Sequence, residues 1–202
     1  MKNLFFFDID TQRDLMLRGG ALYVPGAERL IPKLRRLFHF AKTHAITILS
    51  SAYAFSAEDM GSGKKPSHCM RGTEGQRKLD DTLLLHPLVL ESGPVDRSFA
   101  DLVRRHQQII LEKQDDDVFS NVSTEKLLRV LPNRAIVFGV PAESSVRHAA
   151  LGLRRLGFKT AVIQDAILPL SPREGGAAEA AMRKAGVEFI ALELLSGVQE
   201  AM

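Results

Sequence analysis

Short apolar runs alternate along the chain with longer amphipathic segments. Six runs rich in β-branched and aromatic residues favour buried strands, at residues 3–9, 44–51, 107–113, 134–140, 159–165 and 187–193. Four segments between them have the helical period, at residues 26–43, 123–131, 143–156 and 174–185. Strands that alternate with helices are typical of a parallel sheet covered on both faces. The pattern therefore predicts a three-layer αβα sandwich, an α/β fold with a mostly parallel sheet of about six strands.

The region from residue 53 to residue 100 breaks this alternation. It is punctuated by Gly, Pro and Ser and has little periodicity. A loop region of this length inside a compact domain is usually functional, so we expect it to lie over the site. With 202 residues and no internal repeat, the chain is interpreted as a single domain spanning residues 1–202.

The composition narrows the class of protein. A hydrophobic content of 45% and a charged content of 25% are ordinary for a soluble domain, and no apolar run reaches the roughly 20 residues of a membrane span. The apolar start is followed at once by acidic residues, so it favours a strand over a signal peptide, and we expect a cytoplasmic protein. The net charge is only +3 and the arginines are dispersed in pairs. We therefore expect neither a membrane nor a nucleic acid as partner.

Polar residues follow the predicted strands where ligands collect in open α/β sheets, beyond the carboxyl ends. Asp10, Lys113 and Asp165 end apolar runs, and Ser145 begins a helix directly after another run. Any strand has to end in a polar residue, so each position taken singly also fits a solvated strand end. Of these, Asp10, Lys113 and Ser145 are predicted to converge in one pocket at the carboxyl edge of the sheet, because they end or follow strands that should be neighbours.

Three stretches resemble the isochorismatase-like hydrolase superfamily, which includes nicotinamidases: DIDTQRDLM, LEKQDDDVFS and FGVPAESSVRHAALGLRRLG. The resemblance runs from Leu4 to about Phe189 and implies a Rossmann-like three-layer fold. It makes Asp10 the counterpart of the catalytic carboxylate and Lys113 that of the catalytic lysine. Ser145 stands where the family has its cysteine nucleophile, and a serine hydroxyl needs stronger base assistance than a thiol.

The same resemblance implies an oxyanion hole at the turn before Ser145. In the family a cis peptide bond precedes this turn, and here the corresponding bond is Val140–Pro141, of the residue type for which cis is least costly. Val140, Pro141 and Ser145 are therefore expected to form the hole, helped by the N-terminus of the following helix.

The resemblance also implies where a metal would be bound in nicotinamidases. Tyr53 and Phe55 occupy the positions of an Asp and a His ligand, and only His68 of the segment 66–69 is kept. One imidazole does not make a site for a divalent ion, so we expect no metal and no cofactor. Gln12, Tyr53, Phe55, His68 and Phe119 are expected to line a pocket for a small molecule.

Other candidate residues have ordinary interpretations beside the functional ones. The lone cysteine, Cys69, excludes an internal disulfide, and packing is favoured over nucleophilic chemistry for it. His148 lies one helical turn beyond Ser145 and fits a plain helix position as well as a base. The acidic run Asp115, Asp116, Asp117 is most simply a solvated loop.

Three functional interpretations stay open. The first is a degenerate amidohydrolase that keeps a pocket and acts through binding or assembly. The second is an active hydrolase that uses Ser145 on an amide or a vinyl ether. The third is a parent cysteine hydrolase whose nucleophile was replaced deliberately. Substrate identity does not follow from the sequence, and a homo-oligomer is left open.

Overall fold

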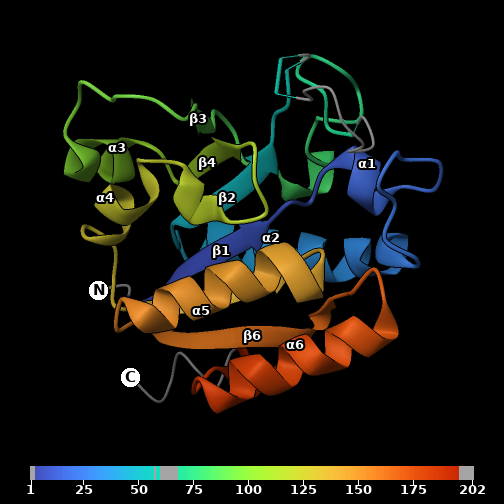
Figure 1. The fold of residues 1–202 in the computed structure, drawn as a ribbon. Coiled ribbons are helices and arrows are strands. Elements are labelled where there is room, and N and C mark those ends of the chain that lie inside the picture. The colour runs from blue at the N-terminus through green and yellow to red at the C-terminus, as the bar shows by residue number, and fades with distance from the viewer. Residues whose placement is uncertain (1–2, 57, 60–67, 196–202) are drawn as a thin grey trace.

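A computed structural model describes residues 3–56, 58–59 and 68–195 of the chain. Seven parallel strands form one sheet in the order β3-β4-β2-β1-β5-β6-β7 (Figure 1). Six of them coincide with the predicted runs, and β3 is the addition. The strands are β1 Phe5–Ile9, β2 Ile48–Tyr53, β3 Leu88–Leu90, β4 Gln108–Lys113, β5 Arg134–Gly139, β6 Lys159–Ile167 and β7 Glu188–Ile190.

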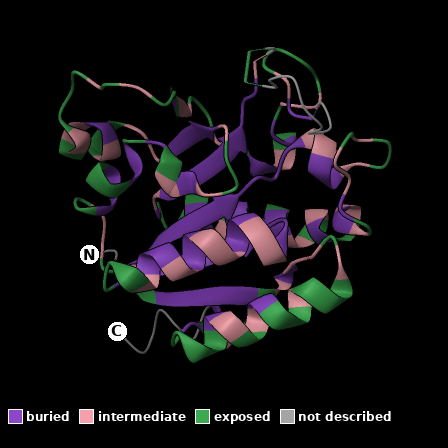
Figure 2. Cartoon of the chain, in the orientation of Figure 1, coloured by how far each residue is buried: buried purple, intermediate pink, exposed green. Residues whose placement is uncertain are grey.

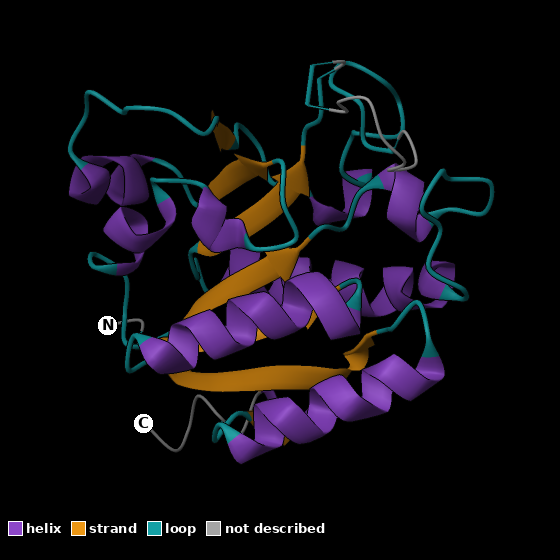
Figure 3. Ribbon diagram, in the orientation of Figure 1, coloured by secondary structure: helices purple, strands orange, loops and turns teal. Residues whose placement is uncertain are grey.

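Helices cover both faces of this sheet, as Figure 3 shows, so the predicted three-layer α/β fold is confirmed. Residues of α1 and α2 pack on one face, and residues of α3, α4, α5 and α6 pack on the other. The helices are α1 Arg13–Met16, α2 Ile31–Thr43, α3 Phe99–Arg105, α4 Thr124–Leu128, α5 Arg147–Arg155 and α6 Pro172–Lys184.

The central strand β1 explains why two separate apolar cores exist. Phe5, Phe7 and Ile9 belong to the core under α5 and α6, while Phe6 belongs to the core under α2. This alternation follows from the period of two of a β-strand. All five residues of β1 are fully buried, and Figure 2 shows the buried sheet between helices whose outer surfaces are intermediate or exposed.

The order of the strands marks one place on the sheet for a ligand. From β1 the chain builds β2, β4 and β3 on one side, and it then returns to place β5, β6 and β7 on the other. The carboxyl ends of β2, β1 and β5 therefore meet where the direction of winding changes. In open α/β sheets this is the place where ligands bind.

The region from residue 53 to residue 100 is more structured than predicted. It contains β3, a short 3-10 helix at Asp80–Thr82 and the start of α3. Isolated bridges join Gln12 to Lys78 and Phe55 to Met70, so part of the region is fastened to the carboxyl edge of the sheet. Pro66 and Ser67 of the segment compared above lie outside the described residues. Across the described ranges, no helix has the length and apolarity that a bilayer span requires.

Candidate functional site

Three side chains that end or follow separate strands meet at the carboxyl edge of the sheet. The Nζ atom of Lys113 lies 2.9 Å from Oδ2 of Asp10 and 3.2 Å from Oγ of Ser145. Asp10 and Lys113 are fully buried, and Ser145 is 1% exposed. The structure thus brings together the three residues that the strand ends predicted to converge, in a centre closed to solvent.

The Lys113 ammonium is held in place by more than its carboxylate partner. It donates to the backbone carbonyls of Asp115 and Asp116, at 2.9 and 3.2 Å. It also lies 3.5 Å from the centre of the Tyr53 ring, within the range of a cation–π contact. As the cationic partner of Asp10, the ammonium has N–H donors and no lone pair with which to accept a proton.

One carboxylate oxygen of Asp10 accepts a hydrogen bond, and the other does not. Its Oδ1 accepts a hydrogen bond of 2.6 Å from the Ser51 hydroxyl. Its Oδ2 has the ammonium beside it but accepts no well-directed hydrogen bond from the described residues. The backbone of Asp10 is left-handed, with a φ of 49°, which places the residue at the turn out of β1. A buried acceptor with spare capacity is rare in native structures, and here it marks the face of the centre toward Lys113.

Tyr53 closes the centre from the side of β2. Its hydroxyl lies 2.9 Å from Oγ of Ser145 and donates to Oδ1 of Asp116 at 2.6 Å. Gln12 fixes the strand end, because its amide accepts from the Tyr53 N–H at 2.7 Å and donates to the Tyr53 carbonyl at 2.8 Å. Burial, followed by the carboxylates of Asp10 and Asp116, raises the pKa of Tyr53 well above its ordinary value. The phenol is therefore neutral in the folded protein.

Ser145 reaches the centre through a tight exit from β5. Gly139 ends the strand with a φ of 125°, and a Cβ there would lie 2.0 Å from the Ile9 carbonyl oxygen, so only glycine fits. The Val140–Pro141 bond that follows is cis. A π-helical turn, Ala142–Val146, then leads into α5 and carries Ser145.

Two of the three residues expected to form the oxyanion hole, Val140 and Pro141, have no free backbone N–H among the described residues. Val140 donates its N–H to the Ile9 carbonyl, and Ala142 donates its N–H to the Leu168 carbonyl. Pro141 has no N–H at all. The oxyanion hole expected at Val140, Pro141 and Ser145 therefore stays a prediction, and its backbone donors would have to come from the turn that leads up to Ser145.

Tyr53, Phe55 and His68 form an aromatic cluster beside the centre. The Tyr53 and Phe55 rings are stacked with centroids 5.5 Å apart, and the His68 ring stands edge-on to both, at 5.2 and 5.1 Å. Burial lowers the pKa of His68, and its Nδ1 has no hydrogen-bond partner among the described residues. No three His, Cys, Asp or Glu residues gather closely enough to hold an ion in the described ranges. Two carbon-rich rings and one imidazole do not fit a divalent metal.

Several residues singled out in the sequence lie outside the cluster. Phe119 packs on α5, where a Cβ on Gly152 would lie 2.1 Å from its ring. Asp165 pairs with Lys33 of α2 at 3.2 Å, so it does not join the other strand ends. His148 has a buried Nδ1 without a hydrogen-bond partner in the described structure.

Cys69 is buried beside the aromatic cluster rather than at the centre. Its N–H donates to Oδ2 of Asp14 at 2.6 Å, and its backbone has a φ of 49°. Burial, followed by the carboxylates of Asp14 and Asp10, raises the pKa of the Cys69 thiol. A thiol that stays protonated is a weak nucleophile, which agrees with a packing role.

Two contributors to the site were not predicted from the sequence. Ser51 donates a hydrogen bond to Asp10, and Asp116 accepts one from the Tyr53 hydroxyl. Asp115 and Asp116 are exposed, as expected of a solvated loop, but the contact of Asp116 with Tyr53 was not predicted. A second buried ion pair, between Asp8 and Lys78 at 2.8 Å, lies two residues before Asp10 in the chain and is separate from the centre. The position of Ser51 at the end of an apolar run was the one available signal for it.

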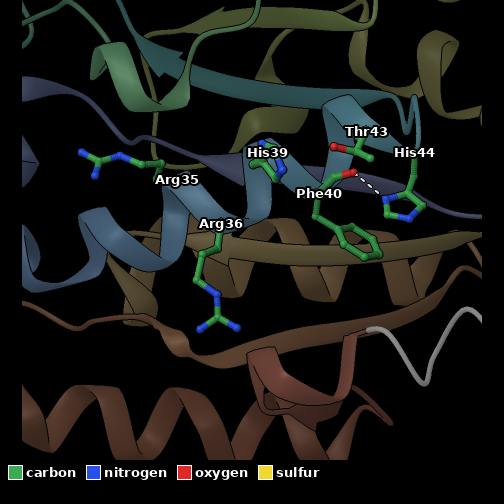
Figure 4. A pocket seen from close by; sticks show the side chains of 6 residues that line it. All are labelled: Arg35, Arg36, His39, Phe40, Thr43 and His44. Carbon is green, nitrogen blue, oxygen red and sulfur yellow. Dashed lines mark hydrogen bonds between the residues drawn. The ribbon is translucent and has the colours of Figure 1, made fainter.

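A surface groove of about 430 Å³ lies elsewhere, on the outer side of α2 (Figure 4). In that view Arg36 and Phe40 extend from the same side of the helix, and Phe40 accepts a hydrogen bond through its carbonyl from the His44 ring. The groove contributes no group to the centre at Ser145. Its lining residues are Arg35, Arg36, His39, Phe40, Thr43 and His44.

Comparison with known families agrees with this geometry. The model of the isochorismatase domain matches residues 5–193, which is nearly the whole chain. The chain belongs to the isochorismatase family. A search of curated proteins finds no match to this member of the family.

Solved structures similar to this family member share its fold. A pyrazinamidase of Pyrococcus horikoshii in complex with zinc is 22% identical with a TM-score of 0.74, covering 94% of this chain and 99% of that one. An isochorismatase family protein from Desulfovibrio vulgaris is 20% identical with a TM-score of 0.77, covering 99% and 100%. A nicotinamidase/pyrazinamidase from Bacillus subtilis is 17% identical with a TM-score of 0.75, covering 93% and 99%. Identities this low establish the architecture and leave the chemistry to be argued from the site.

Proposed function

We propose that the protein is a degenerate member of the isochorismatase family that keeps the polar centre of a hydrolase but acts by binding a small molecule rather than by turnover. The observation that carries this proposal is the burial of Ser145 beneath the Tyr53 hydroxyl, 2.9 Å away. Ser145 takes the place that the resemblance gives to a cysteine nucleophile. An attacking oxygen has to reach a carbonyl carbon, and here the phenol oxygen of Tyr53 stands in that space.

The surroundings of Ser145 supply no ready base. Its hydroxyl contacts the Tyr53 hydroxyl and the Lys113 ammonium in the described structure. The ammonium is paired with Asp10 at 2.9 Å and offers only protons. A serine nucleophile works when an adjacent group accepts its proton, usually a histidine that a carboxylate orients. That partner is not among the two contacts of Ser145.

The backbone before Ser145 is equally unsuited to acyl chemistry. The N–H groups of Val140 and Ala142 are already donated within the fold, and Pro141 has none. Losing one oxyanion donor costs an acyl-transfer enzyme about 100- to 1,000-fold in rate. A missing thiol, a missing base and a depleted oxyanion hole all favour a protein without hydrolytic turnover.

The second candidate is a working hydrolase that uses Ser145. One observation favours it: Ser145, Tyr53 and Lys113 lie within hydrogen-bonding or cation–π distance of one another, so a Tyr53 phenolate beside a lysine would be a base in the right place. The raised pKa of Tyr53 opposes this interpretation, because its neutral phenol has no charge with which to draw the proton from Ser145. We therefore place this candidate second.

Hydrolysis by the unmodified protein and by Ser145→Ala distinguishes the two candidates. The assay uses small amide, ester and vinyl-ether substrates, with covalent labelling by a serine-reactive fluorophosphonate as a second readout. The degenerate interpretation predicts no turnover above the uncatalysed rate and no label at Ser145. Turnover or labelling that disappears in Ser145→Ala would establish the hydrolase instead.

A further inference from the structure

A chain of hydrogen bonds runs from the buried ion pair to the surface of the protein. It starts at Lys113, passes through the hydroxyls of Ser145 and Tyr53, and ends at the carboxylate of Asp116, with steps of 3.2, 2.9 and 2.6 Å. The first three members are buried, whereas Asp116 is an exposed residue. Asp116 is therefore the member of the chain that solvent can reach.

The chemistry of its two ends fixes the direction of every bond in the chain. A carboxylate only accepts, so the single proton of the Tyr53 hydroxyl is used for Asp116. Tyr53 then has no proton left for Ser145, and Ser145 has to donate to the Tyr53 oxygen. The lone pairs of Ser145 are left to accept from the Lys113 ammonium. The Ser145 proton consequently points at a phenol and away from the unsaturated oxygen of Asp10.

We propose that Asp116 is a positioning residue that, through Tyr53, fixes the orientation of the Ser145 hydroxyl and keeps the Tyr53 ring closed over the centre. The inference rests on the proposed function, because it explains how the fold prevents Ser145 from acting as a nucleophile. Two residues hold Tyr53 in place, one at its backbone and one at its hydroxyl. Gln12 holds the Tyr53 backbone, and Asp116 holds its hydroxyl.

The turn after β4 allows this role to be separated from that of Lys113. Lys113 contacts the backbone carbonyls of Asp115 and Asp116, which a change of side chain leaves in place. The Asp115 side chain accepts from the Asp117 N–H and belongs to the same exposed turn. Asp115→Ala is therefore a matched control for Asp116→Ala.

The tyrosine content gives a direct spectroscopic readout. The chain has two tyrosines, Tyr23 and Tyr53, so protein labelled with ¹³C at the tyrosine Cζ atom has two signals, and Tyr23→Phe assigns them. The Cζ shift follows the charge and hydrogen bonding of the attached oxygen. We expect the Tyr53 signal to move in Asp116→Ala and in Ser145→Ala, and to stay in place in Asp115→Ala. An unchanged Tyr53 signal in Asp116→Ala would overturn the proposal.

Accessibility of position 145 provides a second measurement. In Ser145→Cys protein that also carries Cys69→Ser, the labelling rate with a small thiol reagent reports how often Tyr53 uncovers the centre. We expect Asp116→Ala to raise this rate about 10-fold or more, the size that follows from losing a hydrogen bond to a charged group. Asp115→Ala should leave the rate unchanged, and equal rates in the two variants would overturn the proposal. Ser145-dependent hydrolysis by the unmodified protein would refute the proposed function while leaving both of these readouts interpretable.

Discussion

Two buried lysine–carboxylate pairs lie two residues apart along the same strand. Asp8 pairs with Lys78 at 2.8 Å, and Asp10 pairs with Lys113 at 2.9 Å. Each carboxylate also accepts a hydrogen bond from a serine hydroxyl of β2. In residue type, burial and distance the pairs are nearly alike, so the difference between them lies in what surrounds each one.

The pair at Asp8 is closed on itself. Oδ1 accepts from Thr11, Oδ2 accepts from Ser50 and faces the Lys78 ammonium, and Thr11 is bonded in turn to Thr82. Both oxygens are saturated by groups that the fold itself provides. Such an arrangement is a structural network, since every buried polar group in it has its partner.

The carboxylate of Asp10 is buried as well, but it is less completely hydrogen-bonded than that of Asp8. Oδ2 has spare acceptor capacity, and the ammonium of Lys113 extends the contacts to Ser145 and from there to Tyr53. A displacement of two residues along β1 moves a carboxylate from the interior of the strand to its carboxyl end, where ligands bind in this kind of sheet. The two pairs therefore differ in how completely their carboxylates are hydrogen-bonded, and not in burial or in ion pairing.

The largest expected effect comes from neutralising the two carboxylates in turn. Asp8→Asn should lower the free energy of unfolding by about 3–5 kcal/mol, because it leaves the Lys78 ammonium buried without a counter-charge. Asp10→Asn should cost less, about 1–3 kcal/mol, because Lys113 keeps two carbonyls and Ser145 as acceptors. Denaturant unfolding of the two variants measures both values. Equal losses would show that the Asp10 pair is as structural as its neighbour.

A smaller effect on the free energy of unfolding is expected at alkaline pH, from the Tyr53 phenol that contacts Ser145 and Lys113. The pKa of Tyr53 is raised by burial first and then by Asp10 and Asp116. In the unfolded chain a tyrosine ionises near pH ~10, so the unfolded state loses this proton first. The stability is therefore fully present below pH ~10 and is lost above it, by up to about 1.4 kcal/mol per pH unit.

Tyr53→Phe should remove that part of the alkaline slope. The Cys69 pKa is also raised and acts in the same direction, so both proteins are compared in a Cys69→Ser background. Tyr23→Phe controls for the loss of a phenol elsewhere in the chain. Chemical unfolding at a series of pH values gives the slopes. Identical slopes with and without the Tyr53 hydroxyl would contradict a buried neutral phenol at the centre.

The sequence predicted those features that depend on periodicity. Six strands were placed correctly because their apolar runs are continuous, and Asp10, Lys113 and Ser145 were expected to meet because parallel strands end at one edge. The strand Leu88–Leu90 was missed, since three residues within a loop region carry no detectable period. The short helix Phe99–Arg105 was missed for the same reason.

The contacts that cover Ser145 could not be predicted from the sequence. Tyr53 was predicted to fill space as an aromatic ring, but its hydroxyl bonds to Ser145 and Asp116 depend on how two loops are placed in three dimensions. The acidic run was interpreted as a solvated loop; Asp116 is exposed, but it also accepts the hydrogen bond of the Tyr53 hydroxyl, a contact that no pattern in the sequence indicates. The missing backbone donor at Pro141 was readable from the sequence, because proline lacks an N–H wherever it stands.

The smallest effect is expected from His68, in the aromatic cluster beside the centre. Its pKa is lowered mainly by burial, against the opposing influence of the carboxylates of Asp14, Asp116 and Asp10. An unfolded histidine binds its proton near pH ~6.5, so on acidification the unfolded state gains the proton first. The stability tied to neutral His68 is therefore present above pH ~6.5 and is lost as the pH falls toward the lowered pKa.

His68→Phe keeps a ring against Tyr53 and Phe55 and cannot titrate, so its loss of stability between pH ~7 and pH ~5 should be shallower than that of the parent, by up to about 1 kcal/mol. Unfolding curves for parent and variant measure the difference. Parallel curves for parent and variant would show that His68 is solvated in the fold, and would contradict a buried imidazole beside Tyr53 and Phe55.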